Sequence, residues 1–94
     1  MSDEAVFDRA RRAKAVLENE TVTEAIDHIA ERLTAEWRHT PTSLSLHREI
    51  LHAQVYALDS LKAQLAAWID QARALEIKRE REAQRRRPLR VVGR

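Results

Sequence analysis

The histidines are the first residues whose type and spacing could do chemistry, because two of them on one helix face can hold zinc. His47 and His52 lie five residues apart in a segment that we expect to be helical. Zinc-protease helices place their two histidines four residues apart, one turn along the same face. A step of five rotates about 140° around the helix, so these side chains diverge. We interpret them as surface residues, and we predict no metal site and no cofactor.

Pairs of acidic residues are the next candidates, since two carboxylates can share the acid and base roles of catalysis. Glu80 and Glu82, like Glu18 and Glu20, are surrounded by arginine and lysine at helical spacing. That setting is typical of a solvated helix face rather than of a catalytic pocket. The sequence also has no glycine-rich phosphate loop and no nucleophile motif. We therefore expect a protein that is not an enzyme.

The strongest functional signal is the basic end of the chain. Residues 78–94 hold eight lysines and arginines against two acids, whereas residues 1–42 hold nine acids and six bases, a net charge of −3. A run of this kind can neutralise phosphates without reading a base sequence. An acidic protein partner and a merely solvated helix end remain as alternatives. The residues predicted to bind nucleic acid are Lys78, Arg79, Arg81, Arg85, Arg86, Arg87 and Arg90.

The elements that must position these residues are helices. The 94 residues include one glycine and two prolines, and alanine, leucine, glutamate and arginine dominate, a composition that favours helix. The chain has no cysteine, no apolar run of about 18 residues and no apolar stretch after its acidic start. We therefore expect a cytoplasmic protein without a membrane segment. One domain of this size has a thin core, which oligomerisation often completes.

The longest uninterrupted helical segment covers residues 45–87, with Pro88 beyond it. Its apolar residues alternate in steps of three and four, the pattern of a helix that packs lengthwise against another helix. At about 1.5 Å per residue such a helix is roughly 60 Å long, more than one shorter helix can cover. We therefore predict a homo-oligomer. The predicted interface residues are Leu51, Val55, Leu58, Leu61, Leu65, Trp68 and Ile69.

Two shorter helices are predicted before this one. The first, over residues 3–18, is short and rich in alanine, so we expect modest packing from it. A capping box of Thr21 and Glu24 predicts a second helix over residues 22–39, with a kinked continuation of the first helix as the alternative. The second helix has the stronger apolar stripe. Its members are Val22, Ile26, Ile29, Leu33 and Trp37.

Pro41 breaks the helical pattern and reverses the chain, which gives the predicted fold. That fold is all-α: an antiparallel helical hairpin over residues 1–87, with a long coiled-coil-like C-terminal helix, in an oligomer. Residues 88–94 form a basic C-terminal tail. Within the tail we predict a segment that docks on a partner, formed by Leu89, Val91 and Val92.

Several short runs also carry a resemblance to a known group of proteins. They are residues 11–19 (Arg-Arg-Ala-Lys-Ala-Val-Leu-Glu-Asn), Leu33 with Trp37, residues 48–51 (Arg-Glu-Ile-Leu), and Leu58 with Leu61 and Lys62. Over most of residues 9–70 the chain resembles small all-helical phage and prophage proteins of the packaging and head module. In size and layout it is similar to a reduced small terminase, a helical hairpin that forms a ring and recruits the large terminase.

The resemblance implies a function that composition alone does not. A small terminase is an oligomeric adaptor that binds DNA and hands it to a motor protein, without catalysis of its own. This chain has no clear N-terminal helix-turn-helix domain, so the implied DNA binding has no strong sequence specificity. The alternative is a structural or assembly protein of a phage-like particle, whose basic end binds an acidic protein partner.

Overall fold

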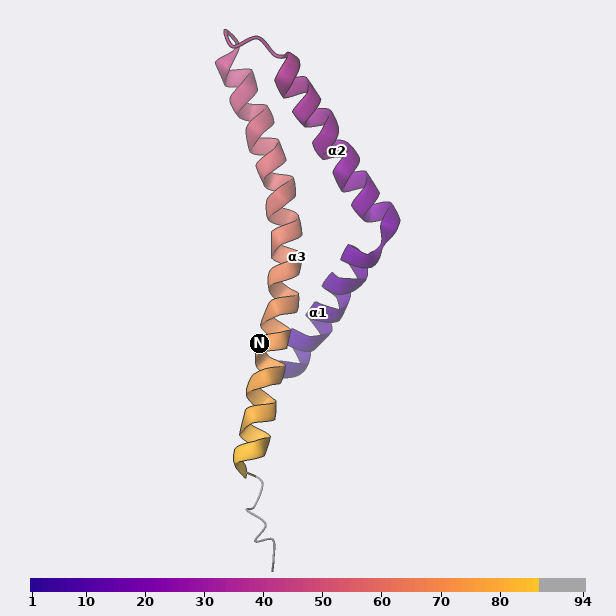
Figure 1. Ribbon diagram of the computed structural model, residues 1–94, viewed down its shortest axis with the longest axis vertical. Helices are drawn as coiled ribbons and strands as arrows, with labels where there is room; N and C mark the ends of the chain where they lie inside the picture. Colours follow the sequence, from indigo (N-terminus) through magenta and orange to yellow (C-terminus); the bar gives the residue numbers. More distant parts are fainter. Residues whose placement is uncertain (87–94) are drawn as a thin grey trace, which may run out of the picture.

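The computed structural model describes residues 1–86, which form three helices. These are α1 (Asp3–Glu18), α2 (Glu20–His39) and α3 (Ser45–Arg86). Figure 1 shows α3 as a continuous rod, with α2 and then α1 lying along it. The predicted all-α hairpin with a long C-terminal helix is confirmed. The predicted tail, residues 88–94, lies outside the described residues.

The hairpin turn between α2 and α3 is held by hydrogen bonds from both sides. The backbone N–H of Leu44 donates to the carbonyl of Pro41 at 3.0 Å, which closes the turn. Arg48 of α3 donates from Nη1 to the carbonyls of Trp37 and Thr40, at 2.9 and 2.7 Å. The last carbonyls of a helix have no partner within the helix, so an arginine from the next helix both satisfies them and fixes the two helices together.

A single extended residue, Asn19, separates α1 from α2. Its φ and ψ are −78° and 108°, and its side-chain oxygen accepts from the N–H of Val22 at 3.1 Å. The second helix therefore begins at Glu20, two residues before the predicted start, and its cap is Asn19 rather than Thr21. Asparagine is among the strongest N-cap residues, because its amide oxygen reaches the unpaired N–H groups of the first turn.

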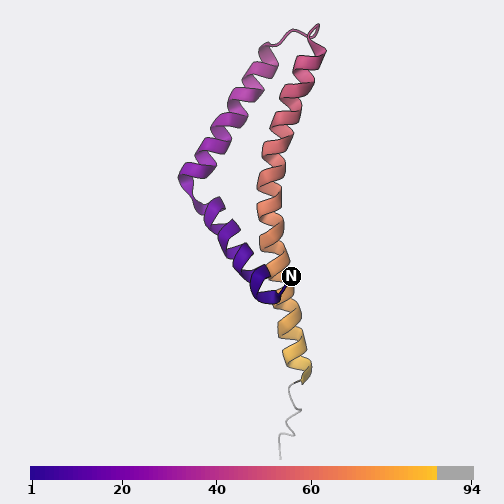
Figure 2. The same cartoon turned by 180° about the vertical axis from the view of Figure 1, so that it is seen from behind.

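The two halves of α3 are covered differently. Along the C-terminal half of α3, Val6 and Ala10 of α1 pack on Ala72, with Phe7 and Leu75 beside them. Along the other half, α2 contributes a single buried residue, Ile26. In Figure 2, as in Figure 1, the bend between α1 and α2 lies away from α3.

The molecule is elongated rather than compact. Its radius of gyration is 21.9 Å, and its principal extents are 81 × 27 × 26 Å. A compact chain of 94 residues has a radius of gyration of about 12 Å. Much of the apolar surface of such an elongated chain therefore stays exposed. Within residues 1–86, every helix falls short of the length or apolarity needed to cross a membrane.

Candidate functional site

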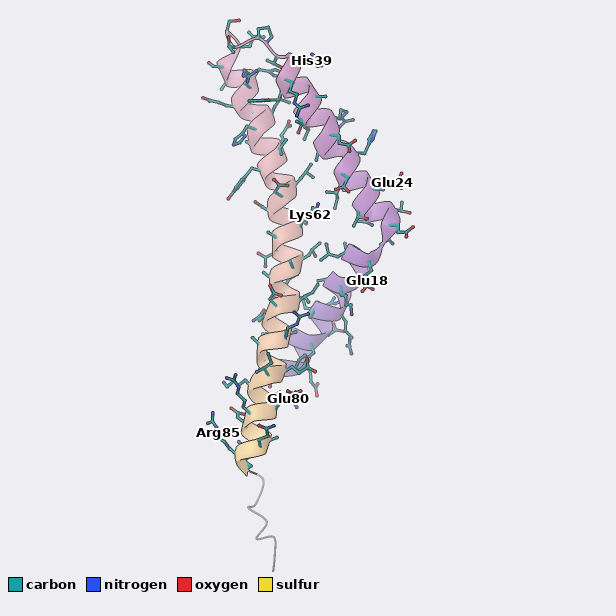
Figure 3. The ribbon with its side chains drawn as sticks, in the orientation of Figure 1. Glu18, Glu24, His39, Lys62, Glu80 and Arg85 are labelled. Atoms are coloured by element: carbon teal, nitrogen blue, oxygen red, sulfur yellow. The ribbon has the colours of Figure 1, made fainter. Side chains whose placement is uncertain are left out.

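The candidate nucleic-acid site is the end of α3, where the rod continues beyond α1. We call residues 78–86 the basic tip. Figure 3 shows Glu80 and Arg85 on this projecting part of the helix. All five of its predicted binding residues in the described range are exposed: Lys78, Arg79, Arg81, Arg85 and Arg86. The other two, Arg87 and Arg90, lie outside the described residues, as do the predicted docking residues Leu89, Val91 and Val92.

Three bases of the basic tip share one side of α3. Lys78, Arg81 and Arg85 follow at steps of three and four, so they lie within about 60° of one another. Glu80 lies on roughly the opposite side, whereas Glu82, one turn from Lys78, borders the three bases. The helix thus presents a basic stripe, of Lys78, Arg81 and Arg85, that can follow a line of phosphates.

Arg79 has a contact within the chain. Its guanidinium lies 5.5 Å from the centre of the Phe7 ring of α1. A guanidinium over an aromatic face is attracted by the negative π surface. This contact joins the start of α1 to the base of the basic tip and orients the helix end relative to the rest of the molecule.

The opposite charge gathers on α2. Glu20, Glu24, Asp27 and Glu31 follow one another at steps of four, three and four, and they line one polar surface together with Thr23 and His28. We call these four acids the acidic stripe. Asp27 is engaged by Lys62 of α3, whose Nζ lies 3.4 Å from Oδ1. A polyanion is repelled by the acidic stripe and attracted by the basic tip, so these two surfaces differ electrostatically.

The seven predicted interface residues differ in exposure. Leu51 and Leu65 are buried inside the chain, with 3% and 8% of their surface exposed. Leu61 is the one exposed member, at 49%. The half-buried members are Val55, Leu58, Trp68 and Ile69. In this structure most of the predicted stripe packs within one chain, because α1 and α2 lie on it; the interface between copies stays a prediction.

Exposed apolar residues lie on α3 outside the predicted stripe. Leu46 is 70% exposed and Ile50 is 49% exposed. Both lie in the half of α3 that runs beside α2 (Figure 1). Sequence reasoning missed them, although a signal was present: Leu46, Ile50, Ala53 and Ala57 form a second apolar series at steps of four, three and four.

Each tryptophan is paired with an arginine from another helix. The guanidinium of Arg9 lies 4.7 Å from the ring centre of Trp68, and its Nη2 donates to Oε1 of Gln71 at 2.8 Å. The guanidinium of Arg48 lies 4.2 Å from the ring centre of Trp37. These contacts cross from α3 to α1 and to α2, so they clamp both halves of the fold. The partners are far apart in sequence, and no local pattern marks them.

All four histidines are exposed on the helices. His47 is directed to α2, where its Nε2 lies 3.3 Å from Oε1 of Glu36. No group of three or more potential metal ligands occurs in this part of the chain. Asp8 is the one carboxyl with a clear change: a hydrogen bond from Arg11 and the charge of Arg12 lower its pKa below the ordinary value. That exposed pair lies on the surface of α1.

Comparison of the chain with models of protein families, with curated proteins and with solved structures gives no match.

Proposed function

We propose that this protein is a non-catalytic, self-assembling helical adaptor that binds DNA through the basic tip, as in viral-type DNA packaging. One observation carries the proposal: five exposed bases occupy nine residues at the projecting end of the long helix α3. A helix end of this kind contacts phosphates and sugars rather than base edges. The adaptor therefore holds DNA without strong sequence preference.

The case for assembly comes from the surface. The chain exposes 7920 Å². A compact monomer of 10.9 kDa exposes about 5,600 Å². A stable protein interface removes about 800 Å² from each partner. The excess surface of this rod is larger than that requirement, and it includes apolar side chains, so self-association has enough surface to use.

The recruitment of a motor protein is the part of the proposal that the resemblance to small terminases supplies. In that arrangement the body of the adaptor assembles, and its C-terminal segment binds the large terminase. The separation of charges on this chain supports such a division of roles. DNA is attracted to the basic tip, while the acidic stripe on α2 keeps the phosphates away from the body of the rod.

Fluorescence anisotropy with a labelled DNA duplex tests the binding. If Lys78, Arg81 and Arg85 each contact one phosphate, affinity falls roughly 40-fold between about 50 and 200 mM salt. Replacing all three by glutamine removes these contacts. We expect weak binding from this tip variant, and a plot of log affinity against log salt whose slope is reduced by about three.

A matched control removes the same charge elsewhere, with Arg32→Gln, Arg38→Gln and Arg73→Gln. This variant is expected to keep most of the salt-dependent binding, because none of these residues lies in the basic tip. Equal losses from the two triple variants would show that net charge alone governs binding and would contradict the proposal.

No binding of any duplex at low salt also overturns the adaptor. If polyglutamate binds to the basic tip under those conditions, the result favours the alternative hypothesis, a structural or assembly protein with an acidic protein partner.

A further inference from the structure

A second apolar stripe of α3 lies outside the packing of the single chain. We call it the open face and define it as Leu46, Ile50, Ala53, Ala57 and Leu61. Their spacing of four, three, four and four keeps them within about 80° of one another around the helix. All five are exposed, and the three large ones are 49–70% exposed. Three large aliphatic side chains exposed to water on one side of one helix are unusual for a surface that has no binding partner.

The position of the open face relative to α2 follows from a contact between the two helices. Glu36 of α2 and His47 of α3 meet at 3.3 Å and mark one side of the hairpin. Ile29 precedes Glu36 by seven residues, and Leu61 follows His47 by fourteen, so each lies close to that same side. Ile29 is itself exposed at 36%. Ile29 and the Leu61 end of the open face thus lie toward the same side of the hairpin.

The open face is also free of charge, although 34% of the residues of this chain are charged. Its five members are apolar, and Gln54, Ser60 and Gln64 on the same side of α3 are uncharged polar residues, while Glu49 borders it beside Leu46 and Ala53. The centre of a protein interface is typically depleted of charge in this way. The centre of the open face offers a charged partner nothing to pair with, whereas another uncharged helix face fits.

The order of side-chain sizes along the open face indicates which helix face would bind it. Along the open face a large residue, two small ones and a large one follow as Ile50, Ala53, Ala57 and Leu61, an order that reads the same in both directions. In a two-fold interface the same patch serves both subunits, so a patch with this symmetry matches itself. Two antiparallel copies with Ala53 opposite Ala57 would bring Ile50 within one residue of Leu61 of the second copy. Alanines at the centre allow two helices to approach closely.

We propose that the open face binds the open face of a second copy of this chain, with the two α3 helices antiparallel and crossing between Ala53 and Ala57. The inference rests on the self-assembly in the proposed function and names the surface that carries it. It also places the basic tips. Residue 86 lies about 46 Å along the helix from the centre, so the two tips would be roughly 90 Å apart. A parallel pair would instead hold two clusters of like charge together, which is unfavourable.

Light scattering with matched variants tests the surface. We expect the native chain to have twice its 10.9 kDa mass, or a multiple of that dimer, and Ile50→Glu or Leu61→Glu to halve the mass. Tyr56→Glu is the control, since Tyr56 is 69% exposed but lies on another side of α3, and its mass should not change. Circular dichroism confirms that each variant stays helical. Leu46→Glu replaces either variant that fails to fold.

Spin-label distances test the antiparallel orientation. The chain contains no cysteine, so Asp70→Cys introduces a single site on an exposed part of α3. In the antiparallel pair the two labels lie about 45 Å apart along the axis. In a parallel pair they are neighbours, and a short distance would overturn the proposal.

The outcomes separate this inference from the proposed function. A native oligomer whose mass is the same in the Ile50→Glu and Leu61→Glu variants overturns the open-face interface, while self-assembly through other residues stands. A native chain that is monomeric at every concentration overturns both the interface and self-assembly. Salt-dependent DNA binding by that monomer would still support the role of the basic tip. Halved mass in both variants, with the Tyr56→Glu control intact, supports the interface.

Discussion

The two helices of the N-terminal half pack on α3 with very different success. Over its 16 residues α1 buries Val6, Ala10 and Ala13. Over its 20 residues α2 buries Ile26 alone. The helix with the larger apolar side chains, which the sequence marked as the stronger partner, therefore has the looser contact. The alanine-rich helix, from which we expected modest packing, forms the tighter one.

Side-chain size explains the difference. Ala10 of α1 meets Ala72 of α3 in the buried cluster, and such small residues let two helix backbones approach. Among the large residues of α2, Trp37 lies at the contact with α3, and both Trp37 and Ile29 stay more than one third exposed. Apolar area stabilises only when it is removed from water. A strong apolar stripe is thus a potential contact, and the partner's shape decides how much of it is buried.

The largest expected effect comes from removing a buried leucine of the tighter half. Leu65→Ala should lower the free energy of unfolding by about 2–5 kcal/mol, because it leaves a cavity beside Ala13. Leu58→Ala, one heptad earlier and half-buried, should cost clearly less. Urea denaturation at one fixed chain concentration measures both. Equal losses would remove the distinction between the two halves.

Overpacking tests the role of small residues directly. Ala72→Leu should lower the free energy of unfolding by about 1–3 kcal/mol, since three added heavy atoms force α1 away from α3. Ala74→Leu places the same side chain at an exposed position two residues later and should be nearly neutral. Thermal unfolding, followed by circular dichroism, measures the stability of both variants. A tolerated Ala72→Leu would mean that close approach is not what tightens this half.

The bend that separates the two halves is expected to contribute less. Asn19→Ala removes the hydrogen bond to Val22 and should cost about 1 kcal/mol of unfolding free energy. Asn19→Ser, which keeps a capping oxygen, should recover most of that loss. If the alanine variant were instead more stable, the chain would prefer a continuous helix through residue 19, and the bend would be imposed by packing on α3.

The smallest effect concerns the surface of α1. Because Arg11 and Arg12 lower the pKa of Asp8 in the folded chain, the pair stabilises at pH above the ordinary carboxyl pKa. That contribution is lost as pH falls through the lowered value. NMR titration of Asp8 should give a pKa below that of a free aspartate, and Arg11→Gln should move it back upward. An unshifted pKa would show that this surface pair adds nothing to the tighter half.

Much of the fold could be predicted because its signals are local. One segment without glycine or proline predicts the long helix over residues 45–87, and the structure has Ser45–Arg86. The start of the second helix was misplaced because Asn19 and Thr21 are both competent caps, and they differ by two residues. Choosing between them depends on where α1 must end in order to pack on α3.

The candidate site divides in the same way. Exposure of the five bases of the basic tip follows from their position at a helix end, and sequence reasoning could place it. The open face could not be separated from the packed stripe, because both show the same spacing along α3. The arginine–tryptophan clamps were also missed, since Arg9 and Trp68 belong to different helices and carry no shared pattern.

The amino-acid sequence by itself determined that the chain is helical, where it reverses and which end is basic, because propensity, proline and charge act on neighbouring residues. Only the tertiary structure decided which of two apolar stripes on α3 is used inside the chain. That choice depends on how closely α1 and α2 approach α3. The approach is set by pairs of side chains, such as Ala10 and Ala72, that lie far apart in sequence.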